Sequence, residues 1–336
     1  MKRFEEIDVL RGIAALWVVL YHYLRRYDFI FSEGRRFPFD FPDGELGVYL
    51  FFIISGFVIL MTLRNSRGSW DFVVSRVSRL YPAYWAGMLL TFTLGVLAPL
   101  PGQDYTLNQL AVNATMLQYY FYVPAIDGVY WSLAYELGFY AVMYLLFRRR
   151  LLDHVVPIGA VWLVLALLQF LAIERWDTGI PFRLSVLLVL KFAHLFVAGM
   201  VLHDIWRGRP SAAHAILLAA AIGMAFLVHG RVAGVCVLGF VVLFLAAIAG
   251  RLGWARLSPL VWLGGISYPL YLTHEFLGFR LIRWLETAGL PPAASVAITL
   301  AAALLLAELI SRLIERPAMA GIRGLYRRRV SPQRAV

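Results

Sequence analysis

Long apolar runs are the feature that most constrains how this chain can fold. Runs of about 20 residues recur along nearly the whole of its 336 residues, of which 61% are hydrophobic and only 15% are charged. A bilayer admits only structures whose backbone hydrogen bonds are internal, and continuous runs favour helices over barrels, whose strands alternate. The sequence therefore predicts an all-α polytopic membrane protein with about ten transmembrane helices, at residues 7–25, 46–63, 80–98, 129–147, 154–173, 184–203, 212–229, 232–250, 260–281 and 294–314.

Basic residues set the predicted orientation. Ten spans put both termini on one side, and most of the 31 Lys and Arg residues fall in segments on that side. Because short cytoplasmic loops are rich in Lys and Arg, we expect both termini in the cytoplasm. The net charge of +11 then reflects topology rather than binding of nucleic acid. We expect a transmembrane domain over 1–322, followed by a disordered, basic cytoplasmic tail over 323–336 that suits anionic lipids.

The outer loop over 99–128 contains no Lys or Arg but carries an aromatic run at 119–122. Tyrosine rings suit both a membrane interface and stacking on sugars, so both interpretations stay open. Part of 106–122 is a candidate re-entrant helix.

Arg11 and His22 both lie in the first apolar run. On an α-helix eleven residues turn through about 1100° and rise about 16 Å, so the two side chains share one helix face. Polar residues at such depths are costly and are usually functional. Arg11 is thus a candidate for holding an anion at the cytoplasmic mouth of a cavity, and His22 for proton chemistry deeper in. A histidine satisfied by packing is the alternative.

Arg76 and Arg79 stand at the cytoplasmic entrance to the third predicted span. Residues three apart share a helix face, so two guanidinium groups there suit bidentate contacts to phosphates. Ordinary arginines of a cytoplasmic loop are the alternative, although Arg64 and Arg67 add to the local positive field.

Glu136 lies several residues inside the fourth predicted span, where a carboxylate needs a partner or a cavity. It is a candidate for orienting His22 and stabilising its imidazolium, as an acid does in catalytic triads. A helix-packing salt bridge explains it equally well.

Other polar groups within the predicted spans have weaker signals. Lys191 and His194 lie one turn apart, His274 and Glu275 stand together in the ninth span, and Glu308 with Arg312 is expected to form a structural pair. No group of histidines has the spacing of metal ligands, and the single Cys236 excludes a cysteine-based metal site, so we expect no metal.

Six segments in order resemble the motifs of one family. The first runs from 4 to 12 and on to His22, with an arginine, ten residues and then the histidine; the others are 51–57, 76–85, 131–140, 267–274 and 314–317. Together they resemble membrane acyltransferase family 3, the group that contains bacterial polysaccharide and lipopolysaccharide O-acetyltransferases. The resemblance covers nearly the whole chain.

This resemblance implies a multi-pass enzyme of the bacterial inner membrane. It would transfer an acyl group, most often acetyl, from cytoplasmic acyl-CoA to a hydroxyl of an extracytoplasmic glycan or lipid-linked glycan. The family implies His22 as the central catalytic residue, Glu136 as a supporting acid, and Arg11, Arg76 and Arg79 as acyl-CoA contacts. Many members carry an extra periplasmic hydrolase-like domain, which these residues do not contain. The membrane domain would then complete the transfer itself or pass the acyl group to a separate periplasmic protein.

Hydroxyl groups such as those of Ser55 and Ser132 are candidates for stabilising the tetrahedral oxyanion. Tyr84, Trp131 and His274 are weaker candidates for substrate contacts. The alternative from another functional class is a transporter of an acylated or anionic metabolite, with His22 and Glu136 as a proton relay.

Overall fold

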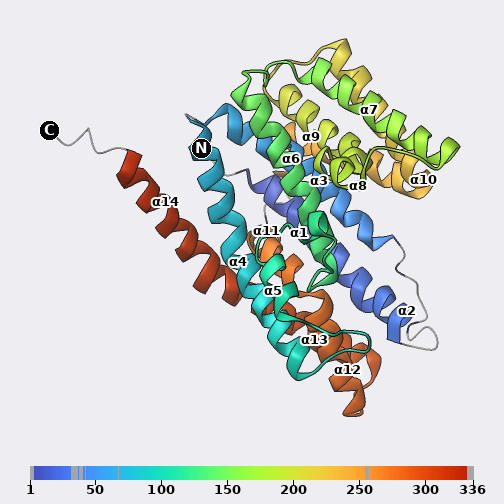
Figure 1. Ribbon diagram of the computed structural model, residues 1–336, viewed down its shortest axis with the longest axis vertical. Helices are drawn as coiled ribbons and strands as arrows, with labels where there is room; N and C mark the ends of the chain where they lie inside the picture. Colours follow the sequence, from blue (N-terminus) through green and yellow to red (C-terminus); the bar gives the residue numbers. More distant parts are fainter. Residues whose placement is uncertain are drawn as a thin grey trace. The chain divides into compact units, whose positions relative to one another are not determined.

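The computed structural model describes residues 4–31, 37, 41, 43–66, 68–253 and 257–330. Every regular element in that part of the chain is a helix, which confirms the all-α prediction (Figure 1). The chain divides into two compact units. Unit 1 comprises Met1–Val18, Asp43–Asn65 and Trp131–Gly264, and unit 2 comprises Val19–Pro42, Ser66–Tyr130 and Gly265–Val336.

Helices long and apolar enough to cross a membrane number six among the described residues. Their length and composition make the chain a membrane protein, while the count of ten spans and the cytoplasmic termini stay predictions. The six are Glu5–Phe31, Gly47–Arg64, Ser69–Leu97, Val155–Trp176, Ala212–Ile248 and Pro292–Val330.

Unit 1 is built around the close packing of α3 against α9. A methyl group added at Gly56 would overlap the carbonyl oxygen of Phe196, and one added at Gly199 would overlap that of Ile53. Small residues allow this approach of two backbones, as is common in membrane helix pairs. The helices of unit 1 are most of α1 (Glu5–Tyr21), α3 (Gly47–Arg64), α6 (Trp131–Arg148), α7 (Val155–Trp176), α8 (Phe182–Leu187), α9 (Ala193–Trp206), α10 (Ala212–Ile248) and the start of α11 (Ser258–Thr273).

The span predicted over 184–203 is not one continuous helix, because the structure breaks it between α8 and α9. Val189 adopts a left-handed conformation with φ of 49°, which an α-helix cannot continue. The Trp162 indole donates a hydrogen bond to the Leu188 carbonyl oxygen at 2.7 Å, so this carbonyl has a side-chain partner at the break. By contrast, α10 turns at Gly230, with φ of 85°, where the sequence predicts two separate spans.

Arg64 ties together the ends of three elements of unit 1. It pairs with Asp204 near the end of α9 and donates to the Leu152 carbonyl oxygen, 2.7 Å away, in the loop after α6. Burial alone would raise the pKa of Asp204, but hydrogen bonds from His203 and Arg64 lower it to about 2. Arg64 therefore has a structural partner, and Arg67 lies outside the described residues.

Unit 2 contains the longest loop of the chain, between α4 and α6. That loop holds only a short helix, α5, and two 3₁₀ turns, so the predicted re-entrant segment over 106–122 is helical over Leu107–Asn113 and Gln118–Phe121. The helices of unit 2 are α2 (Tyr27–Phe31), α4 (Ser69–Leu97), α5 (Leu107–Asn113), the end of α11, α12 (Glu275–Thr287), α13 (Pro292–Ile310) and α14 (Arg316–Val330).

The ninth predicted span, over 260–281, is also interrupted, with His274 between α11 and α12. Pro269 has no N–H for the helical ladder, and Nδ1 of His274 lies 3.2 Å and 2.9 Å from the carbonyl oxygens of Leu270 and Tyr271. The imidazole thus bonds backbone groups of the preceding helical turn.

Two turns of unit 2 are π-helical, His22–Arg26 after α1 and Ser311–Glu315 between α13 and α14. Such turns are rare and occur often at functional sites. The structural pair predicted for Glu308 and Arg312 is confirmed. The predicted disorder over 323–336 is wrong for 323–330, which continue α14, and residues 331–336 lie outside the described part of the chain.

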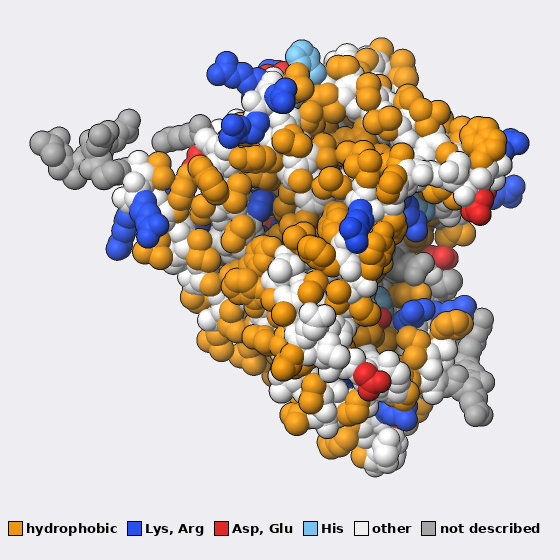
Figure 2. Space-filling view, in the orientation of Figure 1, with side chains coloured by type: hydrophobic (Ala, Val, Ile, Leu, Met, Phe, Trp, Pro, Cys, Tyr) orange, Lys and Arg blue, Asp and Glu red, His pale blue; other side chains and the backbone are white. Residues whose placement is uncertain are grey.

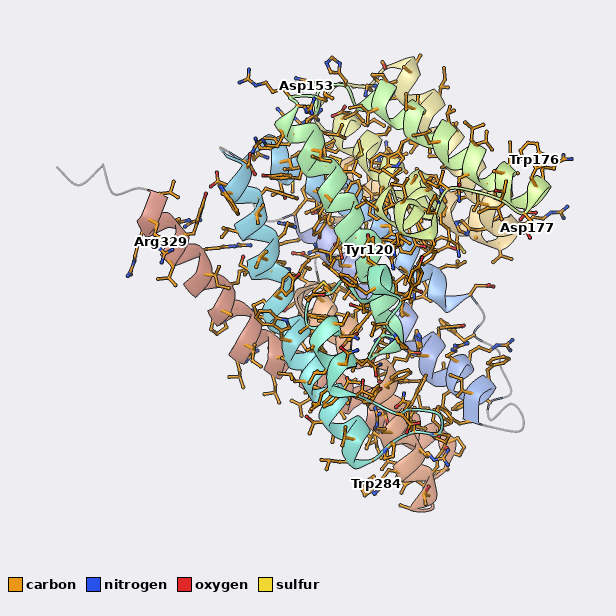
Figure 3. The ribbon with its side chains drawn as sticks, in the orientation of Figure 1. Tyr120, Asp153, Trp176, Asp177, Trp284 and Arg329 are labelled. Atoms are coloured by element: carbon orange, nitrogen blue, oxygen red, sulfur yellow. The ribbon has the colours of Figure 1, made fainter. Side chains whose placement is uncertain are left out.

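Large hydrophobic side chains remain exposed on both units, as a lipid-facing surface requires. Figure 2 shows hydrophobic side chains over most of the visible face. Examples are Leu97, Ile216 and Leu313, which are 74%, 70% and 70% exposed. Trp176 and Trp284, at the ends of α7 and α12 (Figure 3), are also exposed.

Candidate active site

His22 is the first residue of the π-helical turn that follows α1, and its side chain is buried with 8% exposure. Its Nδ1 lies 3.2 Å from Nε2 of His274, and the two rings meet edge to face with centroids 4.8 Å apart. The Tyr23 hydroxyl donates to the carbonyl oxygen of His274 at 2.9 Å. Consecutive side chains of the π-helical turn therefore contact one residue at the break between α11 and α12.

The hydrogen bonds of His274 define which nitrogen of His22 can accept a proton. Nδ1 of His274 faces two carbonyl oxygens, which only accept, so this nitrogen carries the proton. In the neutral ring Nε2 of His274 is then an acceptor, and Nδ1 of His22 must donate to it. The network thus assigns the lone pair of a neutral His22 to Nε2.

Glu275 faces that second nitrogen. Its Oε1 lies 3.6 Å from Nε2 of His22, and the residue is 5% exposed. A methyl group added at Gly128 would overlap Oε2 of Glu275, so glycine at this position lets the carboxyl group lie against the loop backbone. A proton that arrives on Nε2 would therefore meet an acidic side chain directly.

Asp127 completes this buried cluster from the loop before α6. One carboxylate oxygen accepts from the backbone N–H of Val129 and the other from that of Phe276 in the first turn of α12, each at 3.3 Å. Asp127 and Glu275 also interact electrostatically with each other. Burial is the main cause that raises the pKa of Asp127 to about 7.

The predicted phosphate-binding arginines lie in the first half of α4, also in unit 2. Arg79 forms an ion pair with Glu315, whose side chain is fully buried on the second π-helical turn. The guanidinium carbon of Arg79 also lies 5.8 Å from the centroid of the Tyr268 ring, and that of Arg76 lies 5.9 Å from the Phe72 ring. Both arginines are half-buried, and their binding of phosphates stays a prediction.

Arg11 belongs to unit 1 and lies 3.5 Å from the Asp8 carboxylate on the same helix. The shared helix face of Arg11 and His22 involves residues of both units and stays a prediction. A common site for Arg11, Arg76 and Arg79 stays a prediction for the same reason.

Glu136 also belongs to unit 1, where its partners are hydroxyl groups. Its Oε1 accepts from Ser55 Oγ at 3.5 Å and from the Tyr140 hydroxyl one helical turn further along α6. The predicted pairing of Glu136 with His22 would join the two units and stays a prediction. Within unit 2 the carboxyl group beside His22 is that of Glu275.

The remaining candidates differ in what their side chains contact. Ser132 is buried. Tyr84 is fully buried and donates to the Asn113 carbonyl oxygen at 2.7 Å, which gives it a packing role between α4 and α5. Trp131 packs against Phe52 and Phe192 in an aromatic cluster of unit 1. His274 touches His22 directly.

The sequence analysis did not place Glu275 and Asp127 beside His22. A signal for Glu275 was present, since it follows His274 inside a predicted span where an acid needs a partner. Asp127 had no comparable signal, because an acidic residue in a predicted loop is normally solvated.

Comparison with known proteins agrees with the predicted family. A family model described as an acyltransferase domain, of the type 3 acyltransferases, matches residues 4–312. The exopolysaccharide production protein ExoZ of Rhizobium meliloti (strain 1021) is 28% identical over 333 residues, which cover 89% of this chain and 96% of ExoZ. The acyltransferase MdmB of Streptomyces mycarofaciens is 27% identical over 376 residues, which cover 97% of this chain and 94% of MdmB. No solved structure matches the chain significantly. A family match over most of the chain, together with these full-length relatives, makes this protein an acyltransferase of membrane acyltransferase family 3.

Proposed function

We propose that this protein is an O-acyltransferase of the bacterial inner membrane. It transfers an acyl group, acetyl in the simplest case, from cytoplasmic acyl-CoA to a hydroxyl of an extracytoplasmic glycan such as exopolysaccharide or O-antigen. Family membership supports acyl transfer, and the name of the relative ExoZ supports a glycan acceptor. In this proposal the transmembrane domain extends to residue 322. The acceptor of the acyl group is free glycan, lipid-linked glycan or a separate periplasmic carrier protein.

The observation that carries the proposal is the arrangement around His22. Its Nδ1 is hydrogen-bonded to His274, and its Nε2 faces Glu275. A neutral imidazole with a defined tautomer is suited to general base catalysis near neutral pH. Burial in a region of low dielectric strengthens the effect of the neighbouring acid on a developing imidazolium.

The reaction needs a single proton shuttle. Nε2 of His22 takes the proton of the acceptor hydroxyl while its oxygen attacks the thioester carbonyl carbon. The tetrahedral intermediate then loses coenzyme A as the carbon–sulfur bond breaks, and the proton on Nε2 passes to the departing thiolate. An ester and free coenzyme A result, and His22 returns to its neutral state. Hydroxyl groups such as those of Ser55 and Ser132 are candidates for stabilising the oxyanion.

Glu275 is the acid that we place beside the imidazolium, and Glu136 is the competing candidate for that role.

On the donor side, we assign Arg11, Arg76 and Arg79 to the phosphates of acyl-CoA. A guanidinium group matches a phosphate with two parallel hydrogen bonds, which supports this assignment.

Vesicles with the protein in one orientation test the reaction and its direction together. Acyl-CoA is supplied outside vesicles whose cytoplasmic face points outward, and a polysaccharide acceptor is enclosed within. We expect free thiol outside and acyl ester inside, both of which are lost in His22→Ala.

Three results would argue against this function. Acyl movement without release of thiol would indicate a transporter. Ester formation only when donor and acceptor share the outer compartment would refute transfer across the membrane. If no acyl-CoA supports turnover but an acylated carrier protein does, the proposal that acyl-CoA is the donor is wrong.

A further inference from the structure

Arg323 on α14 contacts the turn of α4 that carries Arg76 and Arg79. Helix α14 packs against α4, and the two lie side by side in Figure 1. The Nε of Arg323 donates to Ser78 Oγ at 3.1 Å, and its Nη2 donates to the Ser75 carbonyl oxygen at 3.3 Å. Ser78 is fully buried between Arg76 and Arg79 in the sequence, so the guanidinium group of Arg323 is held at a defined position beside both.

Several positively charged side chains gather at this place. Arg323 interacts electrostatically with Arg76, Arg79 and Arg327. The carboxylate of Glu315 pairs with Arg79. Asp71, at the start of α4, accepts from the Tyr326 hydroxyl at 2.9 Å and from the backbone N–H of Gly68, also at 2.9 Å. Like charges held together in half-buried surroundings cost free energy, which a polyanionic ligand would offset.

We propose that Arg323 is a third arginine of the donor site and binds a phosphate of acyl-CoA together with Arg76 and Arg79. The inference rests on the proposed function in that the donor is acyl-CoA. Coenzyme A carries a diphosphate and a separate ribose phosphate, so its recognition needs several cations at defined positions. The two bonds to α4 use two of the five N–H donors of a guanidinium, and a bidentate contact to phosphate needs two more.

Binding of coenzyme A to the purified full-length protein in detergent is the test, because binding separates this role from chemistry. We expect Arg323→Ala to raise the Kd for coenzyme A by about tenfold or more, as the loss of a charge-assisted hydrogen bond implies. Arg323→Lys should restore part of that loss, since an ammonium keeps the charge but not the planar fork. Two controls should change the Kd less than about twofold. Arg329→Ala removes the same charge at the outer end of α14 (Figure 3), and Tyr326→Phe removes a bond that docks α14 without any change in charge.

Each outcome decides between distinct ideas. If the wild type does not bind coenzyme A, the donor in the proposed function is wrong and this inference falls with it. If the wild type binds and Arg323→Ala binds equally well, the donor assignment survives and the inference fails. An equal loss in Tyr326→Phe would mean that docking of α14 explains the effect. If Arg323→Ala weakens association with phosphatidylglycerol vesicles but not with coenzyme A, the phosphate belongs to a lipid headgroup and the inference is also overturned.

Discussion

Two acidic residues sit in contrasting surroundings in the two units. In unit 2, Glu275 lies 3.6 Å from His22 and interacts electrostatically with Asp127. In unit 1, Glu136 contacts the hydroxyl groups of Ser55 and Tyr140. One acid therefore belongs to a cluster of ionisable groups, and the other to a cluster of neutral donors.

This difference bears directly on catalysis. Proton transfer needs neighbours whose charges change together, as in coupled buried carboxyl and imidazole groups. A carboxylate bound by hydroxyl groups instead orients those donors. Both glutamates lie within predicted membrane spans, so depth in the membrane does not distinguish them. The side chains that surround each glutamate distinguish them instead.

The largest effect is expected from His22→Ala, which removes the proposed base. Turnover should fall by roughly 10²–10⁴, the usual contribution of general acid–base catalysis. Release of thiol from acetyl-CoA measures this directly, and binding of coenzyme A should be retained. His154→Ala, at an exposed site before α7, is the matched control. Near-normal turnover in His22→Ala would remove the buried cluster from the reaction.

Substitution of the two glutamates by glutamine tests the comparison itself. Glu275→Gln should lower kcat by roughly 10², because the imidazolium of His22 loses its neighbouring acid. Glu136→Gln should lower it by less than about tenfold, since an amide oxygen still accepts from Ser55 and Tyr140. Steady-state kinetics with acyl-CoA in excess separates kcat from KM. The reverse order of effects would restore Glu136 as the partner of His22.

His274 is expected to act as a positioning residue with a smaller effect. His274→Leu removes the acceptor of the His22 Nδ1–H and should lower kcat by about tenfold, with little change in KM for the donor. His274→Gln offers an amide oxygen in its place and should recover part of the rate. The pH dependence of kcat in His274→Leu should also shift, because the tautomer of His22 is no longer held. Equal rates in the two variants would show that His274 only packs.

The smallest effect concerns the stability contributed by Asp127. Its pKa rises from 3.8 to about 7 on folding, so the folded state holds this proton more tightly than the unfolded state. Stability associated with the proton is fully present below about pH 4 and is lost as the pH rises through about 7. In detergent, the Tm of the wild type should fall as the pH rises through about 7, and Asp127→Asn should make this fall smaller by a few degrees. The comparison uses the change of Tm with pH, so a constant difference in Tm between the two proteins does not affect it. Parallel Tm curves for the two proteins would contradict the proposed burial of the carboxyl group.

The helical class of this chain follows from its sequence for a simple physical reason. Apolar runs of membrane length leave a helix as the structure that satisfies the backbone, so α3 and α7 lie close to where hydropathy predicts them, while α4 begins eleven residues before its predicted span. The predicted pair Glu308 and Arg312 is likewise local, since residues four apart on a helix always meet. Hydropathy does not reveal where a helix breaks. The interruptions at Val189 and His274 depend on hydrogen bonds from side chains to backbone groups.

The candidate site divides in the same way. His22 and the arginines of α4 could be named from spacing, because each pattern lies within one helix. The neighbours of His22 could not, because Glu275 and Asp127 are 253 and 105 positions further along the chain. Such contacts depend on close approaches between segments, such as that allowed by Gly128. The sequence by itself thus determined the membrane class and the family, and it named His22 as the candidate base, through local periodicity and motif order. Only the tertiary structure decided which buried acid faces that histidine, because packing between distant helices sets that distance.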